Sequence, residues 1–196
     1  GALYNKFFGE TERNLREALK LAETMAPCVV WIDEIEKGVS QDSNDGGVSQ
    51  RLLGTLLTWM AEHGKKVFVV ATANNIHVLP PELMRKGRLD EIFFVDLPSA
   101  QVRQAILKIH LKKRGLRPEQ FDLSLLAEIS DGFSGAELEQ AIVSAWHSVK
   151  SEAHAKDMDT EVLMNEIQRT HPLSVTMSER MEALREWAEG RAVNAD

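Results

Sequence analysis

CVVWIDEIEK, residues 28–37, is the stretch that decides the fold, because four apolar residues, Val29 to Ile32, run directly into Asp33 and Glu34. This run predicts a strand over 28–32 that is buried on both faces, as in a parallel sheet with helices on both sides. Such sheets bind their ligands at the carboxyl ends of the strands. The two carboxylates are therefore expected at the edge of the sheet where ligands bind.

Two interpretations of this acid pair stay open on these residues alone. In the first, the pair belongs to a nucleotide hydrolysis site: one carboxylate organises Mg²⁺, and the other orients and deprotonates the attacking water. In the second, the strand runs into a helix whose first turn is acidic, where the helix dipole favours Asp and Glu.

Composition narrows the class of protein. The chain has 196 residues, 43 % of them hydrophobic, and a net charge of −7, so it is not expected to bind polyanions as a whole. Its single cysteine, Cys28, excludes an internal disulfide and fits a reducing compartment. No apolar run approaches the roughly 20 residues that a membrane span requires, and the start of the chain does not resemble a signal peptide. We expect a soluble, cytosolic protein.

The first half alternates helices and strands. Helical periodicity covers 11–26 and 52–60, and apolar runs predict further strands over 67–71 and 92–95. This alternation predicts an α/β domain over residues 1–97.

The second half reads as helical, with no convincing strand. Ser134 and Glu137 have the spacing of a capping box at a helix start. We expect a helical domain over 98–170, then a C-terminal helix and a frayed tail over 171–196. Helices are predicted over 99–114, from this capping box through 149, and over 160–168 and 178–188.

Five motifs resemble those of the AAA family of ATPases, in the family's order, over residues 1 to about 150. They are NKFFGETERNLRE (5–17, pore loop and helix), PCVVWIDEIE (27–36, Walker B), VVATANN (69–75, sensor 1), ELMRKGRLD (82–90, arginine fingers) and DGFSGAELEQA (131–141, start of the lid). The tail PLSVTMSERMEALREWAEGRAV (172–193) also resembles a subgroup found in bacteria and chloroplast genomes. The resemblance implies a P-loop NTPase type of α/β fold, here a truncated parallel sheet with flanking helices, followed by a small all-helical lid.

The resemblance implies a role for each matching residue. Asp33 matches the position that organises Mg²⁺ through water, Glu34 the catalytic base, and Asn74 the amide that holds the attacking water and the γ-phosphate. Arg85 and Arg88 match two arginine fingers that reach the nucleotide of a neighbouring subunit. The alternatives are a strand-end turn residue for Asn74 and ordinary surface arginines.

The same resemblance implies a pore that grips an unfolded polypeptide. Phe7 and Phe8 match the aromatic pore loop, and the polar loop 42–47 matches a second one. The alternative for the two phenylalanines is packing in the core.

Lid residues are implied on the adenine side of the nucleotide. Ile106 and His110 match positions that pack against the adenine, although a lone helical histidine is usually a surface or core residue. Gly135 and Ala136 would let the nucleotide approach the start of a helix. The remaining histidines show no metal-ligand spacing, and no HExxH follows the lid.

One departure from the family concerns the phosphate loop GxxxxGK[ST], which this sequence does not contain. Its only Gly-Lys pair is Gly64-Lys65, with Trp59 at the first glycine position and Lys66 where Ser or Thr belongs. We expect the loop upstream of Gly1, so that this chain is a fragment. Without the amides and lysine of that loop, the chain alone should neither bind ATP tightly nor hydrolyse it.

The predicted function is therefore that of a fragment of an ATPase that remodels or unfolds macromolecules, with ATP and Mg²⁺ as cofactors. The implied assembly is a homo-oligomeric ring, commonly a hexamer in the family, with a protein substrate and no membrane partner. The alternatives are an ATPase that acts on nucleic acid, which the acidic balance disfavours, and a non-catalytic interaction module. The expected location is the cytoplasm, or the chloroplast stroma for a plastid-derived chain.

Overall fold

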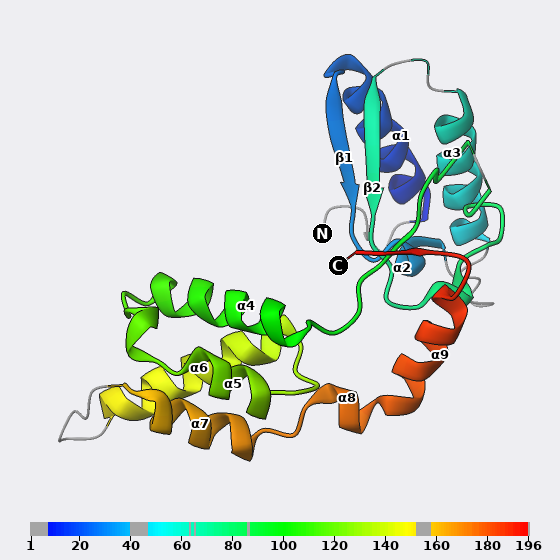
Figure 1. Cartoon of the computed structure of the whole chain (residues 1–196). Helices are drawn as coiled ribbons and strands as arrows, with labels where there is room; N and C mark the ends of the chain where they lie inside the picture. Colours follow the sequence, from blue (N-terminus) through cyan, green and yellow to red (C-terminus); the bar gives the residue numbers. More distant parts are fainter. Residues whose placement is uncertain are drawn as a thin grey trace. The chain divides into compact units, whose positions relative to one another are not determined.

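The structure is a computed structural model, and it describes residues 8–39, 47–62, 64, 66–85, 87–151 and 158–195. The chain forms two compact units, Gly1–Ile92 and Phe93–Asp196 (Figure 1). The expected domain boundaries at residues 97 and 170 stay predictions.

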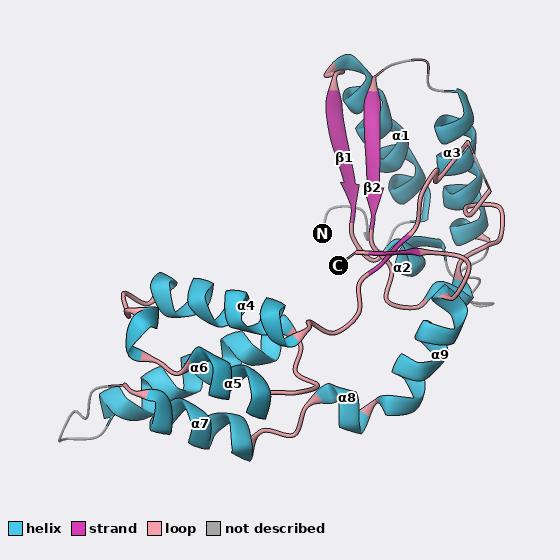
Figure 2. Ribbon diagram, viewed as in Figure 1, coloured by secondary structure: helices cyan, strands magenta, loops and turns pink. Residues whose placement is uncertain are grey.

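The first unit is built on two parallel strands. β1 (Cys28–Ile32) pairs in parallel with β2 (Val67–Ala71) (Figure 2). The register sets Ile32 opposite Ala71. The structure confirms both predicted strands. The helical segments of this unit are α1 (Phe8–Thr24), α2 (Ile35–Val39), α3 (Val48–Glu62) and the 3₁₀ turn η1 (Ile76–Val78).

Within the described part of the chain, one face of this sheet is covered by helices and the other is exposed. Side chains of α1 and α3 form a single buried cluster with the strand face that carries Ile32 and Val69. On the opposite face Val29, Trp31 and Phe68 are 64 %, 64 % and 68 % exposed. The prediction of burial on both faces is therefore wrong for the described residues. An apolar run shows what a strand could bury, whereas the packed helices decide which face is buried.

The second unit is a helical bundle with its own core. Its segments are α4 (Ala100–Lys113), η2 (Pro118–Gln120), α5 (Leu123–Ile129), α6 (Gly135–Ser151), α7 (Thr160–Arg169), α8 (Leu173–Thr176) and α9 (Ser178–Ala188). Buried leucines and isoleucines of α4, α5, α6 and α7 form one cluster. Within the described ranges, no helix has both the length and the apolar character needed to cross a membrane.

The predicted capping box opens α6. The backbone N–H of Ser134 donates to Glu137 Oε2 at 2.8 Å, and the N–H of Glu137 donates to Ser134 Oγ at 3.3 Å. Glu137 also accepts from the backbone N–H of Leu173, at 2.7 Å. Burial alone would raise the pKa of the Glu137 carboxyl. The hydrogen bonds from Ser134 and Leu173 outweigh burial and hold this pKa below its ordinary value.

The ends of the second unit differ in part from the predictions. A strand forms within 92–95 as predicted, β3 (Phe93–Phe94), but it pairs in parallel with β4 (Val193–Asn194) and not with the strands of the first sheet. The expectation of no strand in the second half is therefore wrong at β4. The tail expected to fray is thus ordered through Ala195, whose N–H donates to the carbonyl of Phe94 at 3.0 Å. The pairing needs only backbone groups brought alongside by the preceding helix, so side-chain periodicity carried no signal for it.

Candidate active site

The site is built where β1 and β2 end. The N–H of Thr72 donates to the carbonyl of Ile32 at 2.9 Å, and the carbonyl of Thr72 accepts from the N–H of Ile35 at 2.9 Å. These bonds continue the strand pairing beyond the last residues of both strands. They bring Asp33 and Glu34 next to the segment that contains Asn74.

The structure brings Glu34 and Asn74 into contact. Asn74 Nδ2 donates to Glu34 Oε1 at 3.2 Å, although the two residues are 40 positions apart in sequence. The second oxygen, Oε2, accepts from Lys37 Nζ at 2.5 Å. A carboxylate held at both oxygens has a defined position, as a general base requires.

Asp33 is joined to the same group through a hydroxyl. The Thr72 side chain donates to Asp33 Oδ1 at 2.5 Å, and it accepts from the N–H of Glu34 at 3.0 Å. Glu34 has a φ of +50°, in the left-handed region that non-glycine residues rarely adopt. Asp33, Glu34 and Asn74, predicted from the sequence, thus form one cluster with Thr72 at its centre.

Glu36 is part of the cluster and was not predicted. It is 7 % exposed, and its Oε1 accepts from the backbone N–H of Asn74 at 2.9 Å. Its Oε2 is buried and has no hydrogen-bond partner among the residues that the structure describes. The available signal was a third carboxylate two residues beyond Glu34, which follows the same apolar run as the first two do.

The two predicted arginine fingers differ in their surroundings. Arg85 is exposed, while Arg88 is half-buried and donates from Nη1 to the carbonyl of Glu82 at 2.7 Å. Between them, Gly87 at φ +88° allows the turn that also links the N–H of Arg88 to the carbonyl of Arg85 at 3.2 Å. Arg85 is thus the arginine presented to solvent.

The predicted adenine-side residues lie in the second unit, on α4 and α6. A Cβ added to Gly135 would lie 3.5 Å from Ile106 Cδ1, so these two residues are neighbours. His110 Nδ1 lies 3.1 Å from Glu139 Oε1, and this buried nitrogen makes no hydrogen bond within the described residues. Ala136 is exposed. The structure therefore brings Ile106 and Gly135 together, with His110 one helical turn further along α4.

The predicted pore residues receive little description. Phe7 lies outside the described residues, as do residues 42–46 of the second loop. Phe8 is the first residue of α1, and its side chain lies outside the described part.

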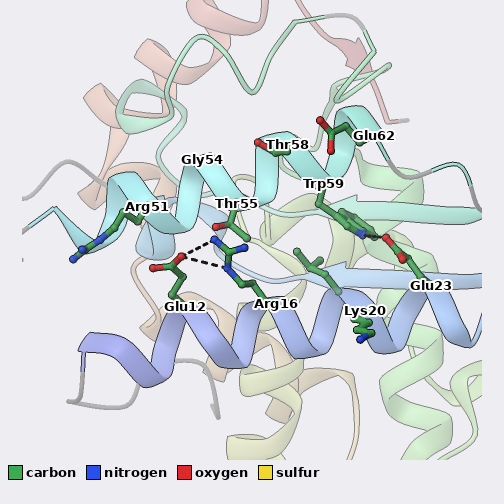
Figure 3. A pocket seen from close by; sticks show the side chains of 11 residues that line it. Glu12, Arg16, Lys20, Glu23, Arg51, Gly54, Thr55, Thr58, Trp59 and Glu62 are labelled. Carbon is green, nitrogen blue, oxygen red and sulfur yellow. Dashed lines mark hydrogen bonds and ion pairs between the residues drawn. The ribbon is translucent and has the colours of Figure 1, made fainter.

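A separate groove of about 520 Å³ lies between α1 and α3. Figure 3 shows Arg16 of α1 paired with Glu12, and Trp59 of α3 donating to Glu23. None of the site residues discussed above lines this groove. Over the residues that the structure describes, no three His, Cys, Asp or Glu side chains are grouped so that they could hold a metal ion.

Comparison with known proteins supports the resemblance found in the sequence. The profile of the AAA family, described as "ATPase family associated with various cellular activities (AAA)", matches residues 1–97. A relative from Guillardia theta is 44 % identical over 193 residues, which cover 96 % of this chain and 37 % of the relative. A relative from Pyropia yezoensis is 45 % identical over 201 residues, which cover 100 % of this chain and 40 % of the relative. Both carry the name "Uncharacterized AAA domain-containing protein ycf46".

A solved structure confirms the fold class. The crystal structure of the FIGL-1 AAA domain matches with a TM-score of 0.78 at 20 % identity, over 98 % of this chain and 66 % of that chain. The fold is thus the predicted one, a short parallel sheet with flanking helices followed by a helical lid. The chain belongs to the AAA family of ATPases. It spans about two fifths of the length of the curated relatives it matches.

Proposed function

We propose that this chain supplies the hydrolytic half of an ATPase site in a longer parent protein. Glu34 acts as the general base, Asn74 positions the attacking water and the γ-phosphate, and Asp33 organises the metal. The observation that carries the proposal is the contact of 3.2 Å between Asn74 Nδ2 and Glu34 Oε1 at the carboxyl ends of two parallel strands. The paired ends of β1 and β2 hold both groups, as a preorganised site requires.

The chemistry of the side chains fits Mg²⁺. The carboxylate of Asp33 is exposed at the sheet edge, and Mg²⁺ prefers such oxygen ligands while keeping several of its waters. When bound, the ion neutralises charge on the phosphates. Asp33 would hold it through water.

We propose that Arg85 and Arg88 complete the site of a neighbouring subunit, so that the parent acts as a ring, with a hexamer as the expected size. Arg85 is the stronger candidate, because it is exposed while Arg88 already donates to Glu82 of its own chain. An arginine finger contributes about 10³–10⁵ to the rate of phosphoryl transfer.

Protein is the proposed substrate, since Phe7 and Phe8 match an aromatic pore loop. The acidic balance of the chain, −7, disfavours nucleic acid. The proposed location is the cytoplasm, or the chloroplast stroma for a plastid-derived protein, without a membrane partner.

We also propose that the 196-residue chain by itself has no ATPase activity, since its sequence contains no GxxxxGK[ST]. The phosphate-binding amides and lysine would come from elsewhere in the parent. A measured turnover of ATP by the isolated chain would refute this part of the proposal.

Glu34→Gln in the parent tests the base. The amide keeps the size of the side chain and one acceptor oxygen but cannot take a proton, so turnover should stop while bound ATP is trapped. Turnover at the wild-type rate would remove Glu34 from this role.

Arg85→Ala mixed into wild-type rings tests the role in trans, with Arg117→Ala as the control for loss of an exposed arginine. Each mutant subunit should also inactivate the site of its neighbour. A fall in activity that is only proportional to the mutant fraction would contradict the trans role.

A separate experiment distinguishes the two proposed substrate classes. The ATPase rate of the wild-type protein is measured with unfolded protein or with single-stranded DNA added, and the substrate class is the one that stimulates the rate.

A further inference from the structure

Thr72, the first residue after β2, contacts four consecutive residues of the acid segment. Its main chain donates to the carbonyl of Ile32 and accepts from the N–H of Ile35, both at 2.9 Å. Its hydroxyl accepts from the N–H of Glu34 at 3.0 Å and donates to Asp33 Oδ1 at 2.5 Å. The segment from Ile32 to Ile35 therefore curves around this single residue.

The main-chain hydrogen bonds of Thr72 do not depend on its side chain, whereas its side-chain hydrogen bonds do. Any residue at this position could make the two main-chain bonds. The two hydroxyl bonds require one oxygen on the β-carbon that accepts and donates at the same time, which only serine and threonine provide. The side chain, rather than the strand pairing, thus joins both acids.

The backbone of Glu34 shows why the hydroxyl matters. At φ +50°, Glu34 is in a conformation that costs a non-glycine residue free energy and persists only where its surroundings hold it. The bond from its N–H to Thr72 Oγ1 supports this conformation. The same oxygen fixes one of the two carboxylate oxygens of Asp33.

We propose that Thr72 is a positioning residue for the ATPase site: its hydroxyl sets the backbone of Glu34 and the carboxylate of Asp33 at the same time. This inference rests on the proposed function, in which those two residues act on ATP. Thr72 itself touches neither the nucleotide nor the water in this scheme, and it acts through the two acids.

Three substitutions separate the hydroxyl from the rest of the residue. Thr72→Val keeps the shape of threonine and removes both hydroxyl bonds, and Thr72→Ser keeps the hydroxyl. Thr58→Val, on the exposed side of α3, controls for the loss of a threonine hydroxyl elsewhere in the same unit. Two readouts are used: ATP turnover by the parent protein, and amide hydrogen exchange at Glu34 in the 196-residue chain.

We expect Thr72→Val to lower kcat about 10–100-fold, the usual cost of removing a partner that orients a site residue, with KM for ATP within about twofold of wild type. Thr72→Ser should keep kcat within about threefold, since the hydroxyl bonds remain. In the 196-residue chain, exchange of the Glu34 amide should become about tenfold faster in Thr72→Val and stay slow in Thr72→Ser and Thr58→Val.

The two proposals fail separately in this design. The inference is overturned by Glu34 exchange in Thr72→Val as slow as in wild type, by an unchanged kcat in that variant, or by a loss of kcat in Thr72→Ser equal to that in Thr72→Val. If the parent with Glu34→Gln turns over ATP at the wild-type rate, the proposed function fails instead. The exchange measurement then still decides whether the hydroxyl holds the Glu34 backbone.

Discussion

Replacement of Arg103 by methionine should destabilise the helical unit more than replacement of an exposed cation on the same helix by methionine. Arg103 lies on α4 and is only 6 % exposed. Its Nε donates to the carbonyl of Ala127 at 2.9 Å, and its Nη1 donates to the carbonyl of Pro98 at 2.8 Å. Nη2 pairs with Asp131 Oδ1 at 3.0 Å. Methionine keeps much of the aliphatic stem but donates none of these bonds.

The magnitude follows from the two carbonyl bonds. Hydrogen bonds to a charged group contribute about 1.5–3 kcal/mol each, so the loss of two gives about 3–6 kcal/mol. The pair with Asp131 adds little, because that carboxylate is 86 % exposed. Removing the guanidinium also removes the cost of its burial. We therefore expect the free energy of unfolding to fall by about 3 kcal/mol, a large part of the 5–15 kcal/mol typical of a domain.

Urea unfolding of the 196-residue chain, followed by circular dichroism at 222 nm, measures this change. Lys108→Met is the matched control, since Lys108 is an exposed cation on the same helix. Its unfolding free energy should stay within about 0.5 kcal/mol of wild type. If Arg103→Met unfolds at the same urea concentration as Lys108→Met, the buried bonds of Arg103 do not stabilise the unit and the reasoning is wrong.

Two further predictions concern the second unit. Gly132→Ala should lower the free energy of unfolding by more than Gly115→Ala. Both glycines have positive φ, at +78° and +73°, but only at Gly132 would a Cβ lie 2.5 Å from Ser174 Oγ; in urea unfolding, equal losses would show that the contact with α8 does not matter. Asp96 accepts from Arg185 Nε and Nη2, both at 2.8 Å, and this hydrogen bonding outweighs burial and lowers the pKa of Asp96 below its ordinary value. A lowered pKa means a contribution that is present above the unfolded value, about 3.9, and lost as the pH falls through the folded pKa. Compared with Asp96→Asn, wild type should therefore gain about 0.2–1 kcal/mol at pH 7, and this advantage should vanish under acid; an advantage that grew below pH 4 would contradict the sign.

Strands and helices with a clear local sequence pattern could be predicted. β1 and β2 have the predicted bounds, because each is a short apolar run that polar residues or turn residues flank. α9 likewise begins at Ser178 and ends at Ala188, as its periodicity indicated. The pairing of β3 with β4 was not predictable, since it joins segments about 100 positions apart through backbone groups that carry no pattern. The exposure of one strand face was not predicted for a similar reason. The hydrophobicity of a strand does not show whether a helix packs against each of its faces.

The same distinction between local sequence signals and long-range contacts applies to the candidate site. The rule that ligands bind where parallel strands end was enough to expect Asp33 and Glu34 at one edge, and the resemblance to the AAA family added Asn74. It could not give Thr72 or Glu36, whose contacts depend on the register between the strands and on the turn after β1. One residue of slippage between β1 and β2 would have moved the Thr72 hydroxyl away from both acids.

Register therefore links the fold to the proposed chemistry. With Ile32 opposite Ala71, Thr72 is the next residue along β2 and meets the chain as it leaves β1. Its main-chain bonds extend the pairing by one step, and its hydroxyl then reaches Asp33 and the N–H of Glu34. Asn74 follows two residues later and reaches the carboxylate of Glu34. The positions of these residues after β1 and β2 thus determine which side chains meet in the site. A change that shifted the register between the strands would therefore displace the acids relative to Thr72 and Asn74.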